Sequence, residues 1–195
     1  MKSWLCVSLS LGAAGASIPG ALLAAQNAVP GGLHRANEIL LAGLRPGRDT
    51  FAIAEKRFKP RNLIDGRDSG FREWRDDCSG KNIRLELDAK SVIQSITITT
   101  LGAQAGKCNE RPGDFLDAKN WVTGRGLRIG DSQDRVTEFY GEPNSAGPAS
   151  KNGQELALMS YQFAWAGSEV PQVMEVLCAR DTGRVVEITL AFPSL

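Results

Sequence analysis

The sequence predicts an α+β protein built from two repeated units, each with one or two helices packed on a three- or four-stranded antiparallel sheet. The first observation is a phrase written almost twice, GLRPGRDTFAIAEKRFKP at 43–60 and GLRIGDSQDRVTEFYGEP at 126–143. The second is a series of segments with alternating polarity after each copy, a pattern typical of strands with one buried face. A chain of 195 residues has room for one domain, or for two small ones that share a core.

The repeated phrase predicts the start of a helix in each copy. Its glycines let the chain turn tightly, and Asp49 and Ser132 stand where a helix N-cap is expected. Pro60 and Pro143 end the helical segments, because proline cannot continue a helix. The core-facing side is predicted to carry Phe51, Ala54 and Phe58 in the first helix, and Val136 and Tyr140 in the second.

A three-stranded meander is predicted after each helix. Short hairpin connections are expected at 89–91 and 180–183, where AKS and RDTG separate alternating segments. When the last strands of the two copies are aligned, Thr97 matches Thr189. The predicted strands are 71–76, 83–88 and 92–100 in the first copy, and 160–165, 172–179 and 184–192 in the second. A further strand is expected at 120–124 and a further helix at 33–43.

The N-terminus has the pattern of an export signal. Lys2 precedes a short apolar core, and small residues follow. The predicted organisation is a signal peptide at 1–28 with cleavage near 16 or 25–28, a first repeat at 33–101, a linker at 102–114 and a second repeat at 115–195. The protein is therefore expected in the periplasm or secreted. The alternative is an uncleaved segment that anchors the chain, and membrane contact is expected only in that case.

Charge and composition exclude several classes of function. Removal of the leader removes Lys2 and leaves as many basic as acidic side chains, whereas nucleic-acid binders usually carry a basic excess. His34 is the single histidine, and both catalytic triads and zinc sites need more partners than the chain supplies. The spacing of Gly124, Gly126 and Gly130 does not fit a dinucleotide fingerprint. No cofactor, no metal and no catalytic residue is predicted.

The cysteines are interpreted through the expected oxidising compartment. Cys78 lies at a predicted strand turn and Cys108 follows the third strand, so both fall at the same end of the meander. We predict a disulfide between them, which would stabilise the fold by roughly 3–4 kcal/mol. Cys178 lies in the middle of a predicted strand and is expected to be a buried free thiol.

An aromatic face in the second sheet is the candidate binding site. Tyr161, Phe163 and Trp165 alternate onto one side of a strand, and Met174 and Val176 share one side of the next. A partly exposed set of this kind anchors protein interfaces. The alternative is that a helix and the other repeat cover these side chains. Trp74 in the first sheet would extend the exposed face.

The phrase at 126–143 resembles the helix start of the small exported SmpA/OmlA (BamE-like) domains, which are associated with outer-membrane barrel assembly. The tandem architecture is also similar to that of the secreted β-lactamase inhibitor protein. These resemblances imply protein binding without catalysis. We therefore expect an exported, non-catalytic protein-binding module of the bacterial cell envelope. The alternatives are a secreted inhibitor or binder of one exported enzyme, and a hydrolase whose acid pair assembles only in the fold.

Overall fold

The computed structural model describes residues 37–58, 63–66, 70–76, 80–102, 118–163 and 172–192. Its helices are α1 (Phe51–Phe58) and α2 (Gln133–Tyr140), with a 3₁₀ turn, η3, at Ala118–Asn120. The strands are β1 (Leu63–Gly66), β2 (Phe71–Asp76), β3 (Lys81–Leu87), β4 (Ile93–Thr99), β5 (Ser145–Lys151), β6 (Gln154–Phe163), β7 (Gln172–Ala179) and β8 (Val185–Ala191).

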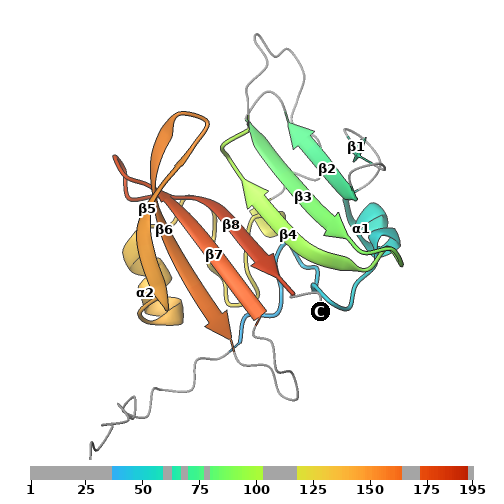
Figure 1. Cartoon of the computed structure of the whole chain (residues 1–195), viewed down its shortest axis with the longest axis horizontal. Helices are drawn as coiled ribbons and strands as arrows, with labels where there is room; N and C mark the ends of the chain where they lie inside the picture. The colour runs from blue at the N-terminus through green and yellow to red at the C-terminus, as the bar shows by residue number, and fades with distance from the viewer. Residues whose placement is uncertain are drawn as a thin grey trace, which may run out of the picture. The chain divides into compact units, whose positions relative to one another are not determined.

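All eight strands belong to one continuous antiparallel sheet with the order β1-β2-β3-β4-β8-β7-β6-β5. The prediction of an α+β fold with two repeated units, each with its own three- or four-stranded sheet, is wrong, because the described chain is mostly β and β4 pairs with β8 (Figure 1). A meander that ended at β4 would leave the backbone groups of that strand unpaired. Pairing it with β8 satisfies both edges and joins the two apolar surfaces into a single core.

Equivalent strands of the two halves meet at the β4–β8 junction. Helix α1 precedes β1–β4, and α2 precedes β5–β8. At the junction Thr97 lies directly opposite Thr189, and their Oγ1 atoms are 2.9 Å apart. A cross-strand threonine pair of this kind stabilises the pairing modestly. The middle of the sheet is therefore held by backbone bonds and by a hydroxyl contact.

One of the two predicted helix caps is confirmed. Ser132 is the N-cap of α2, and its Oγ accepts a hydrogen bond from the backbone N–H of Arg135. Asp49 is not the cap of α1, because the helix begins at Phe51 and Thr50 occupies the preceding position.

Asp49 instead closes the turn before the helix, as Asp131 does in the second copy. Its Oδ2 accepts from the backbone N–H of Arg45 at 2.8 Å, and Asp131 Oδ2 accepts from that of Arg128 at the same distance. The first copy has one additional residue in this turn, which shifts its aspartate away from the cap position. An alignment without a gap cannot show this shift.

Three other local predictions differ from the structure. Residues 37–43, the described part of the predicted helix at 33–43, are not helical, and Leu41 forms isolated bridges with Leu44 and Thr123. The strand predicted at 120–124 consists only of isolated bridges. Strands β1 and β5 were not predicted, because both are short of apolar alternation, as the sequence SAGPASK of β5 illustrates.

One face of the sheet carries the core. Residues directly opposite each other in antiparallel pairs project from the same face, so the register defines a row across all eight strands. Phe58 of α1 packs on Trp74 with ring centroids 5.1 Å apart, and Tyr140 of α2 packs on Tyr161 at 5.7 Å. Both helices therefore cover this face. The row is Leu63, Trp74, Ile83, Ile98, Ile188, Val176, Met159 and Ala146.

Several predictions concern residues outside the described ranges. These are the leader at 1–28, Cys78, Cys108, Trp165 and residues 103–114 of the expected linker. The described part of the chain contains no disulfide, and the cysteine within it, Cys178, is free. No helix among the described residues has the length and apolar character needed to cross a membrane. The boundaries between leader, repeats and linker remain predictions.

Candidate binding surfaces

The predicted aromatic face lies in the core. Tyr161, Phe163, Met174, Val176 and Trp74 are all fully buried. The ring of Tyr140 stands 5.7 Å from that of Tyr161 and 6.0 Å from that of Phe163, so α2 covers them. Alternation along a strand shows that residues share a face, but it does not show which face is exposed to solvent. These five side chains therefore present no exposed surface to a partner.

The opposite face of the sheet is polar over β3, β4 and β8, whereas β6 and β7 also project Leu158, Leu177 and Val173 from it. The register defines a second row on it, and Thr97 and Thr189 stand at its centre. No helix among the described residues lies on this surface, which we call the polar face. A half-covered antiparallel sheet with one polar side is a stable arrangement. The row is Ile64, Glu73, Arg84, Thr97, Thr189, Glu175, Ser160 and Ser145.

Charged side chains of the polar face pair with one another. Arg75 Nη2 lies 3.1 Å from Glu73 Oε1, and Lys151 Nζ lies 2.6 Å from Glu187 Oε2. The two carboxylates are almost fully buried, each with its basic partner half exposed above it. The guanidinium of Arg84 stands over the ring of Phe71 on the same face, 4.4 Å from the ring centroid. These charges largely cancel locally, and their side chains are held in fixed positions.

A buried carboxylate, which the sequence did not reveal, joins the start of the described chain to the second copy of the phrase. Glu38 is 1% exposed. Its Oε2 accepts from the hydroxyl of Tyr140 at 2.7 Å and from the backbone N–H of Arg125 at 3.0 Å. Its Oε1 accepts from the backbone N–H groups of Ile39, Leu40 and Gly124. Five donors therefore satisfy one buried acid, as burial of a charge requires.

Tyr140 has a pKa raised well above its ordinary value. Burial is the main cause, and the negative charge of Glu38 adds to it, while a hydrogen bond with Thr123 opposes it. The folded state thus favours the neutral phenol. Its contribution to stability is complete below the unfolded pKa of about 10, and it falls as pH rises above that value.

We expect the free energy of unfolding to fall between pH 9 and pH 11, with about 1.4 kcal/mol of the loss at pH 11 due to Tyr140. Tyr140→Phe should have a shallower pH dependence and be about 1–2 kcal/mol less stable at pH 8, since it loses the phenol hydrogen bonds. Urea titrations of the parent protein and of Tyr140→Phe at pH 8 and pH 11 test this. Parallel pH profiles would contradict the assignment.

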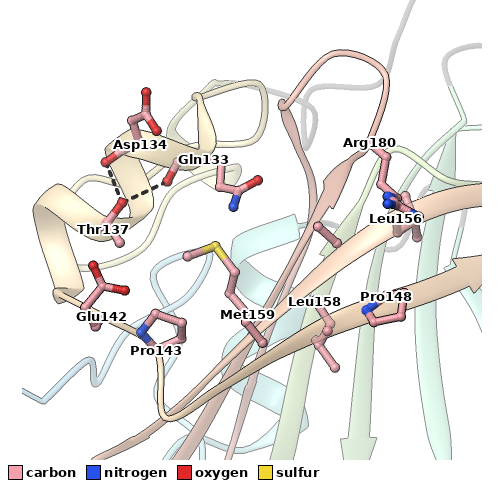
Figure 2. A pocket seen from close by; sticks show the side chains of 13 residues that line it. Gln133, Asp134, Thr137, Glu142, Pro143, Pro148, Leu156, Leu158, Met159 and Arg180 are labelled. Atoms are coloured by element: carbon pink, nitrogen blue, oxygen red, sulfur yellow. Dashed lines mark hydrogen bonds between the residues drawn. The ribbon is translucent and has the colours of Figure 1, made fainter.

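A groove lies between α2 and the edge of the sheet, with a volume of about 550 Å³. One wall carries polar groups of α2 and of the segment after its C-cap, including Asp134, Thr137 and Glu142 (Figure 2). The other side is formed by β5 and β6, where Pro148 lines the groove and the side chain of Met159 points toward the helix. The groove is amphipathic and was not predicted, because β5 was not.

No group of three His, Cys, Asp or Glu among the described residues is placed to hold a metal ion. Asp134 and Glu142, the acids that line the groove, are exposed. The hydrolase alternative requires two facing carboxylates with different environments. No observation on the described residues favours it.

Cys178 is buried in β7, as predicted. Burial raises the pKa of its thiol to about 11. The thiolate is the reactive form, so the native protein should resist alkylation at pH 8. We expect iodoacetamide to label Cys178 at least about 100-fold more slowly in buffer than in urea. Mass spectrometry of the peptide that contains it measures both rates, and equal rates would show that the strand opens readily.

No protein-family model and no curated protein matches the chain. Among solved structures, it is similar to a DUF4309 family protein (YjgB) from Bacillus subtilis, with 14% identity and a TM-score of 0.47 over 80% of this chain and 88% of that chain. A likeness this weak supports no inference about function. Because no family model matches and the described strands form one continuous sheet, the expected resemblance to SmpA/OmlA (BamE-like) domains, and with it to the β-lactamase inhibitor protein, is wrong.

The reason for that error lies in what the phrase does. Gly126 and Gly130 adopt φ values of 99° and 92°, which strongly favour glycine, and Ser132 caps the helix that follows. A turn into a capped helix needs these residue types in any fold. The phrase therefore reports a local structure and does not identify a family.

Proposed function

We propose that this chain is an exported, non-catalytic protein-binding module of the bacterial cell envelope, and that its partner binds on the polar face. The observation that carries the proposal is that the broad polar face has no helix over it among the described residues, while the other face holds the core. Export itself rests on the leader pattern at 1–28.

The polar face suits a protein partner better than a polyanion. Its charges form local pairs such as Arg75 with Glu73 and Lys151 with Glu187, so the surface presents no large positive field. The side chains stand on a hydrogen-bonded sheet, and little conformational freedom is lost when a partner binds such a preorganised surface. Thr97 and Thr189 supply hydroxyl groups at its centre, and Ser160 supplies another on β6.

The test is site-specific photocrosslinking in the native host, with the chain expressed behind its own leader. A crosslinking residue at Glu175, exposed on the polar face, should capture a discrete partner. The same residue at Ile53, exposed on α1, is the positional control and should capture nothing specific.

Two variants show whether the capture depends on the polar face. Thr97→Arg places a long charged side chain at its centre and should reduce the crosslink from Glu175 about tenfold. Glu55→Arg, a change of an exposed residue on α1, should leave it unchanged. Equal crosslinking at the two probe positions, or none in the envelope fraction, would refute the proposal.

A further inference from the structure

Among the described strands, β5 is an edge of the sheet and pairs with β6 alone. The two strands are joined by the two-residue turn Asn152-Gly153, with φ values of 53° and 77° that match a type I′ hairpin. The pair that closes such a turn, Lys151 and Gln154, exchanges both backbone bonds. Hydrogen-bonded and non-bonded pairs then alternate along the ladder.

That alternation determines which backbone groups of β5 face outward. Counting back from Lys151, the groups of Ala149 and Gly147 bond to β6, and those of Ser150, Pro148 and Ala146 point away from the sheet. Pro148 agrees with this assignment, because proline in a strand is tolerated where its missing N–H would face solvent. The free edge therefore offers the N–H groups of Ala146 and Ser150 and the carbonyls of all three residues.

The groove lies along this same edge. The side chains of Ala146 and Pro148 are small and project to the face covered by α2, opposite Met159 and Ala157. They leave the space of about 550 Å³ unfilled. A strand that added to β5 would send every second side chain into this space.

The charges along the groove differ from one part to another. Asp134 and Glu142 lie on the α2 side, and Arg180 lies across the groove (Figure 2). Arg180 Nη1 is 3.7 Å from Glu155 Oε2, and both side chains of this long ion pair are exposed. The α2 wall therefore favours a positive side chain, while Met159 and Pro143 provide apolar contact beside it.

We infer that this groove binds an extended peptide segment, which adds to β5 as a ninth strand and places a lysine or arginine along the α2 wall that carries Asp134 and Glu142. Main-chain bonds to the edge supply affinity and the side chain in the groove supplies selectivity, as in other cases of strand addition. This site is separate from the polar face, so it goes beyond the proposed function. It takes a flexible segment, whereas the polar face takes a folded surface.

The test uses the whole mature chain and two end-capped synthetic peptides, Ser-Val-Lys-Val-Ser-Ser and Ser-Val-Glu-Val-Ser-Ser. Amide chemical shifts in NMR spectra of the labelled protein report where each peptide binds. We expect the lysine peptide to shift the amides of Ala146, Gly147 and Ser150, and to bind about tenfold more tightly than the glutamate peptide. This comparison needs no variant, so it does not depend on the folding of a mutant.

Three variants then separate charge from edge pairing. Asp134→Asn combined with Glu142→Gln should weaken the lysine peptide about tenfold, since the α2 wall loses both of its negative charges. Ala146→Pro removes an outward N–H without removing a ladder bond, and should weaken both peptides about fivefold. Glu55→Gln, a change of an exposed acid on α1 that does not line the groove, is the matched control and should change nothing.

Two results would overturn the inference. One is that the peptides bind equally well. The other is that neither shifts the edge amides at millimolar concentration. Crosslinking at Glu175 probes the other face of the sheet. Failure of the peptides to bind would therefore leave the proposed function standing, and failure of the crosslink would leave the peptide site standing.

Discussion

Trp74→Ala should lower the free energy of unfolding by about 4 kcal/mol, within the range for large aromatic residues truncated in a core. Trp74 is fully buried in β2. Its ring packs against Phe58 at 5.1 Å and Phe51 at 6.0 Å, so it joins α1 to the sheet. The substitution leaves a cavity on the covered face and removes both contacts. Urea denaturation followed by circular dichroism measures the loss.

Two further variants make this result specific. Trp74→Phe keeps an aromatic ring against Phe58 and should cost about half as much, since less volume is removed. Ile53→Ala, on the exposed side of α1, should stay within about 0.5 kcal/mol of the parent. If Trp74→Ala were as mild as Ile53→Ala, α1 would not pack on the sheet as described.

The individual strands could be predicted because alternation is a local property. The predicted segment 172–179 coincides with β7, and 71–76 coincides with β2. Strand β5 could not be predicted, since SAGPASK has small residues on both faces and a proline within it. An edge strand beside a groove needs no apolar alternation, so its sequence lacks the signal that identifies a strand.

The pairing between β4 and β8 could not be derived from periodicity, because alternation fixes the two faces of a strand but not its neighbours. One signal was present in the sequence. Thr97 aligned with Thr189 as equivalent positions, and in the structure these two residues pair with each other. When two equivalent strands pair across a local twofold relation, one residue meets its own counterpart, so the aligned threonines marked the junction.

Burial of the aromatic residues could not be predicted for the same reason, because alternation does not show what packs on each face of a strand. Tyr161 and Phe163 share a face with Met159, and the register places all three on the side that α2 covers. The polar alternative, Ser160 and Gln162, lies on the other side of the same strand. The sequence divides β6 correctly into two faces. Only the position of α2 decides which of them is available to a partner.

Glu38→Ala should cost about 3 kcal/mol, because it removes the acceptor for five donors at once. The backbone N–H groups of Gly124 and Arg125 and the hydroxyl of Tyr140 would lose their bonds to it. Each buried donor left unsatisfied costs about 1–3 kcal/mol, and water entering the space left by the side chain recovers part of that loss. Equilibrium unfolding in urea at pH 7 measures the difference.

Glu38→Gln distinguishes the loss of an acceptor from the loss of packing. The amide keeps one carbonyl oxygen for the donors of Ile39, Leu40 and Gly124, but it offers N–H groups where Arg125 N–H needs an acceptor. We expect an intermediate cost of about 1.5 kcal/mol. Glu86→Ala, an exposed acid on β3, should cost almost nothing.

Hydrogen exchange gives the local signature of this contact. In Glu38→Ala the amides of Gly124 and Arg125 should exchange faster than the fall in global stability explains, whereas Trp74→Ala should change them only through global stability. Glu38 reinforces a backbone contact in which the carbonyl of Leu40 accepts from the N–H of Gly124, so the local change should extend to Leu40. Unchanged protection at these amides would show that the buried carboxylate does not hold the two segments together.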